Sequence, residues 1–243
     1  MPPRHIVFDI VGTLITYDNL ISALNSRLGP KLLSRNITPT HLVATWFEVA
    51  EREYAYLSIA NAYVPFDICF ENLFYRTLHI AGISSPREFA SQEDLEILLS
   101  AHRELEAREG AKECVRLLHD AGFTVWGLTA GGLDRVRANL DDGGIGIPKG
   151  KLLSCDEAGV GKPDLRAYGP LWERLSKDAG EHGEVWFAAA HAWDVSAARR
   201  VGFKAAYCTA LEGEVIPQLF GEMHVVGESL VQVAEGIVAS SRG

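Results

Sequence analysis

The chain has 243 residues, of which 47% are hydrophobic and 9% aromatic, so it can bury a substantial core as one large domain or as a core with an insertion. Its formal net charge of −9 argues against nucleic acid or an anionic membrane as the main partner. A small-molecule substrate, even an anionic one, is compatible with this charge because one local lysine or arginine can override the overall field.

The first five residues contain no long apolar stretch, and no run approaches the ~18 apolar residues of a membrane span. The cysteines are far apart and form no CxxC pair, which predicts reduced, buried thiols in a cytoplasmic protein. They are Cys69, Cys114, Cys155 and Cys208. An exposed apolar helix in the helical region described below would favour a homodimer.

Five short apolar runs predict β-strands at residues 6–8, 124–128, 185–190, 205–208 and 224–226. After the first strand they alternate with predicted helices at residues 111–121, 133–140, 165–175 and 195–201. Such a pattern is typical of a parallel sheet with helices on both faces. We therefore predict an α/β fold whose functional groups lie just beyond the carboxyl ends of the strands. Residues 239–243 are predicted to fray.

Residues 17–108 differ from the rest, because they have helical periodicity and almost no strand pattern. Helices are predicted at residues 20–28, 40–62, 66–81 and 91–106, and Thr38 followed by Pro39 is typical of a helix start. This interval predicts a helical cap inserted into a core of residues 1–16 and 109–243. Its aromatic residues are expected mainly to form a core, while a few could line a substrate pocket. They are Trp46, Phe47, Tyr54, Tyr56, Tyr63 and Phe66.

A carboxylate ends the first predicted strand: Asp9 is followed by a turn that contains Gly12 and Thr13. This position is expected to aim one carboxylate oxygen outward. Half-burying a carboxylate is costly, so the pattern favours a nucleophile, a base or a metal ligand. The alternative is an acid that caps the next turn.

The second predicted strand ends at Thr129, which is followed by Ala130 and two glycines. The glycines free backbone N–H groups to face a ligand, and the Thr129 hydroxyl can hydrogen-bond an anion. The same residue can instead cap the helix predicted from residue 133.

Two further loops carry titratable side chains. Lys162 lies between a glycine and Pro163, which suits a fixed positive charge, although a single lysine usually lies on a solvated surface. It does not belong to a phosphate-binding P-loop, because no Ser or Thr follows it. His191 and Asp194, three residues apart, can share one face of a starting helix. His191 is either a base that activates water or a structural histidine.

Together, these four segments resemble the four motifs of the haloacid dehalogenase superfamily, over essentially the whole chain. Trp193 and the helical insertion look most like the L-2-haloacid dehalogenase branch. The resemblance implies a Rossmann-like core with a helical cap. It implies a nucleophilic Asp9 and an anion-holding Thr129. It also implies a charge-stabilising Lys162 and an Asp194 that orients water or the lysine.

Two departures from the superfamily pattern disfavour a phosphatase. Val11 stands where phosphatases carry the acid that protonates the leaving group, and Ala189 and Ala190 stand where they carry an extra magnesium-binding acid. With Asp9 and Asp194 as the evident acids, a magnesium site is undersupplied with ligands. We therefore expect no metal ligands and no cofactor, with Mg²⁺ only if the chain is phosphatase-like.

Other departures concern the dehalogenase branch, which usually has an aromatic residue at the Val11 position and an early cap arginine at the Phe47 position. Arg52, one turn further along, is a candidate substitute. Ala130 and His191 stand where the branch has asparagines. The candidate substrate-binding residues are Val11, Phe47, Arg52, Ala130 and Trp193.

The predicted function is that of a hydrolase in which Asp9 attacks an electrophilic carbon and the resulting aspartyl ester is hydrolysed by water, with His191 as base. A small 2-haloacid is the predicted substrate. The alternatives are epoxide opening, phosphatase activity, and a catalytically degenerate member that binds a small molecule. The enzymatic interpretation requires Asp9, Lys162 and Asp194 to converge within hydrogen-bond reach of one cavity.

Overall fold

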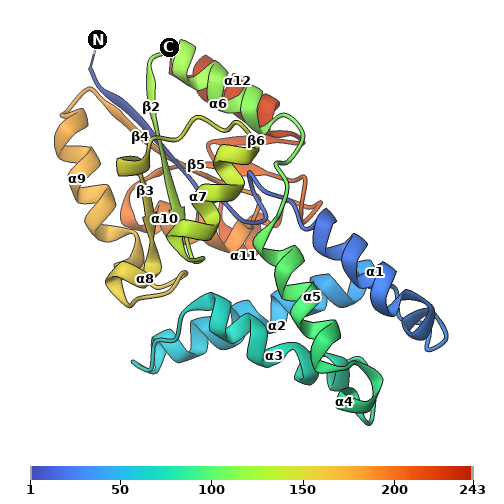
Figure 1. Cartoon of the computed structure of the whole chain (residues 1–243). Helices are drawn as coiled ribbons and strands as arrows, with labels where there is room; N and C mark the ends of the chain where they lie inside the picture. Colours follow the sequence, from blue (N-terminus) through green and yellow to red (C-terminus); the bar gives the residue numbers. More distant parts are fainter. Residues whose placement is uncertain (1, 242–243) are drawn as a thin grey trace. The chain divides into compact units, whose positions relative to one another are not determined.

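The computed structural model describes residues 2–241, which form two compact units (Figure 1). The first unit comprises Met1–Ile15 and Ala107–Gly243, and the second comprises Thr16–Glu106. The second unit is thus a single insertion that leaves the first unit after its first strand.

Within residues 2–241, the first unit contains a sheet of six parallel strands in the order β3-β2-β1-β4-β5-β6. The strands are β1 Arg4–Phe8, β2 Phe123–Thr129, β3 Leu152–Ser154, β4 Glu184–Ala189, β5 Lys204–Cys208 and β6 Val225–Gly227. All five predicted strands are present. The sequence analysis missed β3, whose three residues are too few to make a pattern and which is defined by its pairing with β2.

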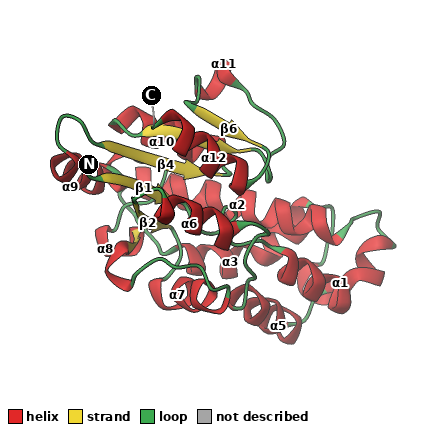
Figure 2. Ribbon diagram, turned by 90° about the horizontal axis from the view of Figure 1, so that it is seen from above, coloured by secondary structure: helices red, strands yellow, loops and turns green. Residues whose placement is uncertain are grey.

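Helices cover both faces of this sheet, so the predicted α/β fold is confirmed (Figure 2). The helices of the first unit are α6 Ala111–Asp120, α7 Leu133–Asp142, α8 Cys155–Ala158, α9 Gly169–Ala179, α10 Ala192–Val201, α11 Pro217–Phe220 and α12 Leu230–Ser240. Helices α9 and α10 bury apolar side chains against the face that contains Val7 and Phe187. Helices α6 and α12 pack against each other and against other strands of the sheet. This double cover explains why the strands are apolar along nearly their whole length.

The C-terminal helix α12 was not predicted. It continues to Ser240, so the prediction that residues 239 and 240 fray is wrong. Arg242 and Gly243, which that prediction also included, lie outside the described residues.

The second unit consists of helices: α1 Asp18–Leu33, α2 Pro39–Ile59, α3 Phe66–Ile80, α4 Pro86–Phe89 and α5 Gln92–Arg103. The predicted start of α2 is confirmed, because the Thr38 side chain accepts a hydrogen bond from the His41 N–H at 3.2 Å and Pro39 occupies the first turn. The Ser91 and Asp94 side chains form a reciprocal capping box at the start of α5.

An aromatic cluster holds the second unit together. Trp46 stacks on Phe70 with ring centroids 4.0 Å apart, and its indole N–H donates to the Phe70 carbonyl at 2.7 Å. Phe47 stacks on Tyr17 with a centroid separation of 3.9 Å. Tyr56 does not belong to this core, because 59% of its surface is exposed. It lies on the outer side of α2, where a tyrosine needs no apolar partner.

No helix between residues 2 and 241 has the length and apolar character needed to cross a membrane. The four cysteines are buried free thiols, as predicted. Burial raises the pKa of the Cys114 thiol to about 12, and the neighbouring Cys208 adds to this shift.

Candidate active site

Asp9 immediately follows β1, which lies between β2 and β4 in the sheet. The Asp9 N–H donates to the Ala188 carbonyl of β4 at 3.0 Å. Gly12, at a φ of 88°, lets the chain turn back directly after the strand. The Asp9 side chain is buried, with 9% of its surface exposed, so the expectation of an outward-facing oxygen is wrong. Lys162 and His191, which come from two other segments of the chain, lie against it.

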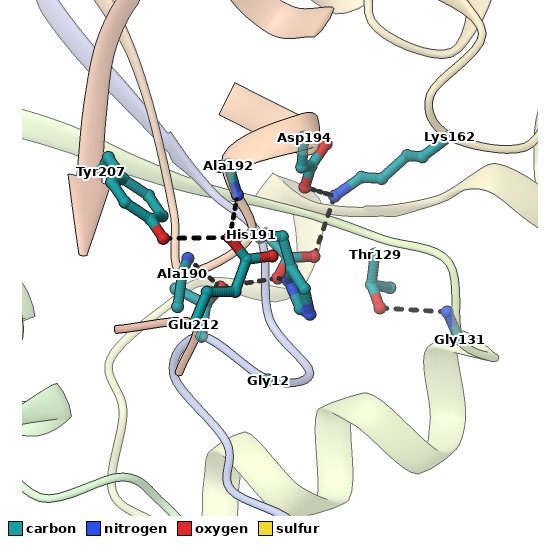
Figure 3. A network of polar contacts seen from close by, with 12 residues as sticks. Gly12, Thr129, Gly131, Lys162, Ala190, His191, Ala192, Asp194, Tyr207 and Glu212 are labelled. Atoms are coloured by element: carbon teal, nitrogen blue, oxygen red, sulfur yellow. Dashed lines mark hydrogen bonds and ion pairs between the residues drawn. The ribbon is translucent and has the colours of Figure 1, made fainter. Parts of the chain in front are cut away.

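Lys162 bridges two carboxylates at this end of the sheet (Figure 3). Its Nζ donates to Asp9 Oδ1 at 2.9 Å and to Asp194 Oδ2 at 2.6 Å. The side chain is 2% exposed, so the alternative of a solvated surface lysine is wrong. Lys162 thus brings the Asp9 and Asp194 carboxylates together at one point; their convergence on a cavity stays a prediction.

Asp194 lies in the first turn of α10 and is fully buried. Its Oδ1 accepts a hydrogen bond from the Tyr168 hydroxyl, which comes from the turn just before α9. Burial and the charge of Asp194 raise the pKa of the Tyr168 phenol well above its ordinary value, so the phenol stays protonated and donates. The sequence analysis missed Tyr168, which belongs to none of the four segments.

The charges of this cluster stabilise one another. Burial alone would raise the pKa of Asp9, but the Lys162 ammonium and His191 hold it well below its usual range. Burial opposes the charged form of Lys162, but Asp194 and Asp9 keep its pKa above the ordinary value. Burial, reinforced by the negative charge of Asp9, raises the pKa of Asp194 in spite of Lys162. At neutral pH, Asp9 is therefore an ionised carboxylate beside an ionised ammonium.

His191 caps the N-terminus of α10 and has a buried side chain (Figure 3). Its Nδ1 lies 3.4 Å from Asp9 Oδ2. The side chain makes no capping hydrogen bond to its own helix; instead, the Glu212 carboxylate accepts the Ala192 N–H at 2.9 Å and the Tyr207 hydroxyl at 3.0 Å. Glu212 was not predicted, and it fixes the backbone that carries His191.

Thr13 and Arg108 complete the environment of Asp9. The Thr13 hydroxyl donates to Asp9 Oδ2 at 2.7 Å and accepts the Ala190 N–H at 2.8 Å. The Arg108 guanidinium donates to the carbonyls of Thr13 at 2.8 Å and Gly12 at 2.7 Å. Thr13 was singled out only as a turn residue. Arg108 carries no recognisable signal, because it is separated from Thr13 by 95 positions.

Thr129 is buried at the end of β2, where its Oγ1 accepts the Gly131 N–H at 3.1 Å (Figure 3). The alternative role as a helix cap is wrong, because α7 begins at Leu133 and Gly132 occupies its cap position. The Ser154 hydroxyl of β3 donates to the Gly131 carbonyl at 2.9 Å and holds this loop from the other side. Ala130, between Thr129 and Gly131 in the sequence, is partly exposed.

The remaining predicted substrate-binding residues lie in different places. Val11 is partly exposed two residues after Asp9, and the Trp193 ring lies 5.4 Å from that of His191. Phe47 belongs to the aromatic cluster of the second unit and is only 4% exposed. Arg52 also lies in that unit, on α2, where it pairs with Glu53 at 3.3 Å. The roles of these residues stay predictions.

Among residues 2–241, no group of three or more His, Cys, Asp and Glu side chains is arranged to hold a metal ion. The Lys162 ammonium lies between the Asp9 and Asp194 carboxylates and bonds both.

A sequence model of the haloacid dehalogenase-like hydrolases matches residues 3–202. The chain belongs to this family. An (S)-2-haloacid dehalogenase of Burkholderia cepacia is 26% identical to this hydrolase over 203 residues, which are 82% of this chain and 80% of that protein. The family resemblance inferred from the four motifs is confirmed.

Solved structures agree with this assignment at the level of the fold. A dehalogenase with an intermediate complex has a TM-score of 0.77 at 22% identity, over 96% of both chains. The L-2-haloacid dehalogenase of Xanthobacter autotrophicus with chloropropionic acid covalently bound has a TM-score of 0.74 at 17% identity, over 97% of this chain and 98% of that one.

Proposed function

We propose that this hydrolase cleaves the carbon–halogen bond of a small 2-haloacid, with Asp9 as the nucleophile. The observation that carries the proposal is the state of Asp9: a buried carboxylate kept ionised by Lys162 at 2.9 Å and oriented by the Thr13 hydroxyl at 2.7 Å. A carboxylate without bulk water around it is a stronger nucleophile than a solvated one. A 2-haloacid is proposed as the substrate because the similar protein of Burkholderia cepacia is an (S)-2-haloacid dehalogenase.

In the first step, an Asp9 oxygen attacks the carbon that bears the halogen. The carbon–halogen bond breaks as the new carbon–oxygen bond forms, and the halide leaves with the bonding electron pair. The step needs no proton, so Val11 in place of an acid is no obstacle. Lys162 remains paired with Asp194 at 2.6 Å when the charge of Asp9 is lost in the ester, so no buried cation is left uncompensated.

In the second step, water adds to the Asp9 carboxyl carbon, and the bond from this carbon to the alkyl oxygen breaks to release a 2-hydroxyacid. His191, with Nδ1 at 3.4 Å from Asp9 Oδ2, is placed to take the proton from that water and return it to the departing oxygen. Thr129 and its loop are proposed to hold anionic oxygens at the same sheet edge.

Epoxide opening is the second candidate, because the pairing of Asp9 with His191 suits hydrolysis of any alkyl ester of Asp9. It makes one further demand: the attack leaves an alkoxide, which needs a proton, whereas a halide does not. Tyr168, a buried hydroxyl near Asp9 and Asp194, is already committed as a donor to Asp194. The halide reaction therefore needs no proton donor for its leaving group, whereas the epoxide reaction does. A phosphatase or a degenerate binding protein has no comparable observation in its favour.

We also propose that the reaction needs no metal or other cofactor and that the chain acts on a small molecule in the cytoplasm. Val11, Ala189 and Ala190 stand where phosphatases carry acids, which leaves few oxygen ligands for Mg²⁺, and the free thiols suit a reducing compartment. A homodimer stays a prediction from the sequence.

The test is halide release from (S)-2-chloropropionate in the presence of EDTA, with Asp9→Asn as the inactive variant. Asp142→Asn, an exposed acid on α7, is the matched control. We expect release by the wild type and the control, and none by Asp9→Asn. No release by the wild type contradicts the dehalogenase proposal, and release that needs Mg²⁺ contradicts the proposed independence of metal.

A further inference from the structure

We propose that Glu212 is a positioning residue for the second step of the reaction; this inference rests on the proposed function and extends it. The Glu212 carboxylate fixes the backbone beside His191 and so sets where the imidazole meets the water that hydrolyses the aspartyl ester. Glu212 belongs to none of the four motif segments. It lies in the loop that follows β5, 20 positions after its bonding partner Ala192.

Helix α10 begins without a cap from the residue that precedes it. A residue at this position usually accepts a backbone N–H with its side chain, but His191 makes no such bond, and its Nδ1 lies 3.4 Å from Asp9 Oδ2 instead. The first N–H groups of a helix have no acceptor within the helix, so the N–H of Ala192 needs one from elsewhere. Oε2 of Glu212 accepts it at 2.9 Å, and a carboxylate also suits the positive end of the helix dipole. The loop after β5 thus provides the cap, while the imidazole of His191 faces the nucleophile.

The Glu212 carboxylate is itself held by the sheet. Tyr207 of β5 is buried and donates its hydroxyl to the same Oε2 at 3.0 Å (Figure 3). Burial and the charge of Glu212 raise the pKa of the Tyr207 phenol, so the hydroxyl stays protonated and donates. Because Tyr207 lies opposite Ala189 in the register of β5 and β4, these bonds join the strand end that leads to Glu212 with the strand end that leads to His191.

The peptide groups on both sides of His191 are fixed by side chains from other segments. The Ala190 N–H donates to Thr13 Oγ1 at 2.8 Å, and the Ala192 N–H donates to Glu212. Thr13 also donates to the nucleophile at 2.7 Å, so its loss should disturb both steps of the reaction. Glu212 holds the side of His191 that leads into α10, so its loss should act mainly on the step that uses the imidazole.

The test separates the two steps in single-turnover reactions with (S)-2-chloropropionate. Halide release measures the attack by Asp9, and decay of the alkylated enzyme, followed by mass spectrometry, measures ester hydrolysis. We expect Glu212→Ala to slow ester hydrolysis roughly 10- to 100-fold, the range for a misplaced reacting group, and to leave halide release within about threefold. Glu212→Gln keeps an acceptor oxygen and should lie closer to wild type. Tyr207→Phe should slow hydrolysis less than Glu212→Ala, because the bond to Ala192 remains.

Glu214→Ala is the matched control on the same loop, because Glu214 accepts the Tyr207 hydroxyl with its backbone carbonyl, at 3.1 Å, and the substitution retains that carbonyl. It should change neither rate. A second comparison uses the His191→Ala background. There, Glu212→Ala should slow hydrolysis further by less than about twofold, because the group that Glu212 positions is already absent.

Two kinetic results overturn the proposal: equal slowing of both steps by Glu212→Ala, or an undiminished effect of Glu212→Ala in the His191→Ala background. A measurement without turnover checks the contact itself, since the Ala192 amide should exchange its hydrogen faster in Glu212→Ala than in wild type. Unchanged exchange also overturns the proposal. Absence of halide release by the wild type is a different result, because it contradicts the proposed function; thermal unfolding of each variant shows whether it is folded.

Discussion

Replacing Lys162 by methionine should destabilise the protein strongly at neutral pH. The ammonium binds Asp9 at 2.9 Å and Asp194 at 2.6 Å, and methionine retains its length but not its charge. Breaking a buried ion pair by removing one partner costs about 3–5 kcal/mol, because the remaining charge is left uncompensated in the interior. Here two carboxylates remain close together. For a chain of this size, we expect a fall in Tm of roughly 10 °C.

The loss of stability in Lys162→Met should depend on pH in a defined direction. Lys162 lowers the pKa of Asp9, so this contribution to stability is present above the ordinary aspartate pKa of about 4 and is lost as the pH falls through the lower folded value. The raised pKa of Lys162 adds stability that is present below about 10.5 and is lost as the pH rises through the higher folded value. In Lys162→Met, one carboxyl should bind a proton instead. The difference from wild type should therefore be largest near pH 7–9 and shrink toward pH 5.

The measurement is urea unfolding of wild type and Lys162→Met at pH 5, 7 and 9, with Lys177→Met, an exposed lysine of α9, as control. The control should stay within about 0.5 kcal/mol of wild type. Asp194→Asn in the Lys162→Met background should recover part of the loss, since it removes one of the repelling charges. A free energy of unfolding for Lys162→Met equal to that of wild type at pH 7 would refute the buried bridge.

Two further predictions concern Arg108 and His5 of the first unit. Arg108→Lys loses the two-pronged contact with the Gly12 and Thr13 carbonyls, so we expect about 1–2 kcal/mol less stability and a slower alkylation of Asp9 in single-turnover assays. Burial lowers the pKa of His5 although Asp178 opposes this, so the unfolded chain binds more protons and stability is lost as the pH falls below about 6.5. His5→Gln should flatten the decline in unfolding free energy between pH 7 and pH 5.

The predictions for Arg108→Lys and His5→Gln each have a matched control and an outcome that would contradict them. Arg116→Lys alters an exposed arginine of α6 and should change neither stability nor alkylation; equal alkylation rates in Arg108→Lys and wild type would remove Arg108 from the positioning of Asp9. His41→Gln alters an exposed histidine at the start of α2 and should keep the wild-type decline with pH. The same decline in His5→Gln would assign the acid sensitivity to other groups.

The order of the secondary-structure elements was readable from the sequence, because hydrophobic periodicity is a local property. Five of the strands, four of the five inserted helices and the Thr38 cap were predicted, while the four-residue helix α4 was not. So were Asp9 and Thr129, since a polar residue that directly ends an apolar strand is visible without knowledge of what lies beside it. The strand β3 was not predicted, because three residues form a strand only through pairing with β2.

Only the tertiary structure decided which side chains meet. Lys162 by itself resembles a surface residue; it is buried because β1 and α10 bring two carboxylates to its nitrogen. Tyr168 and Arg108 lie outside the motif segments, and their bonds to Asp194 and the Asp9 turn join positions that no local pattern relates. The physical reason is that strand order and register, set by packing of the whole core, determine which loops share the carboxyl edge of the sheet.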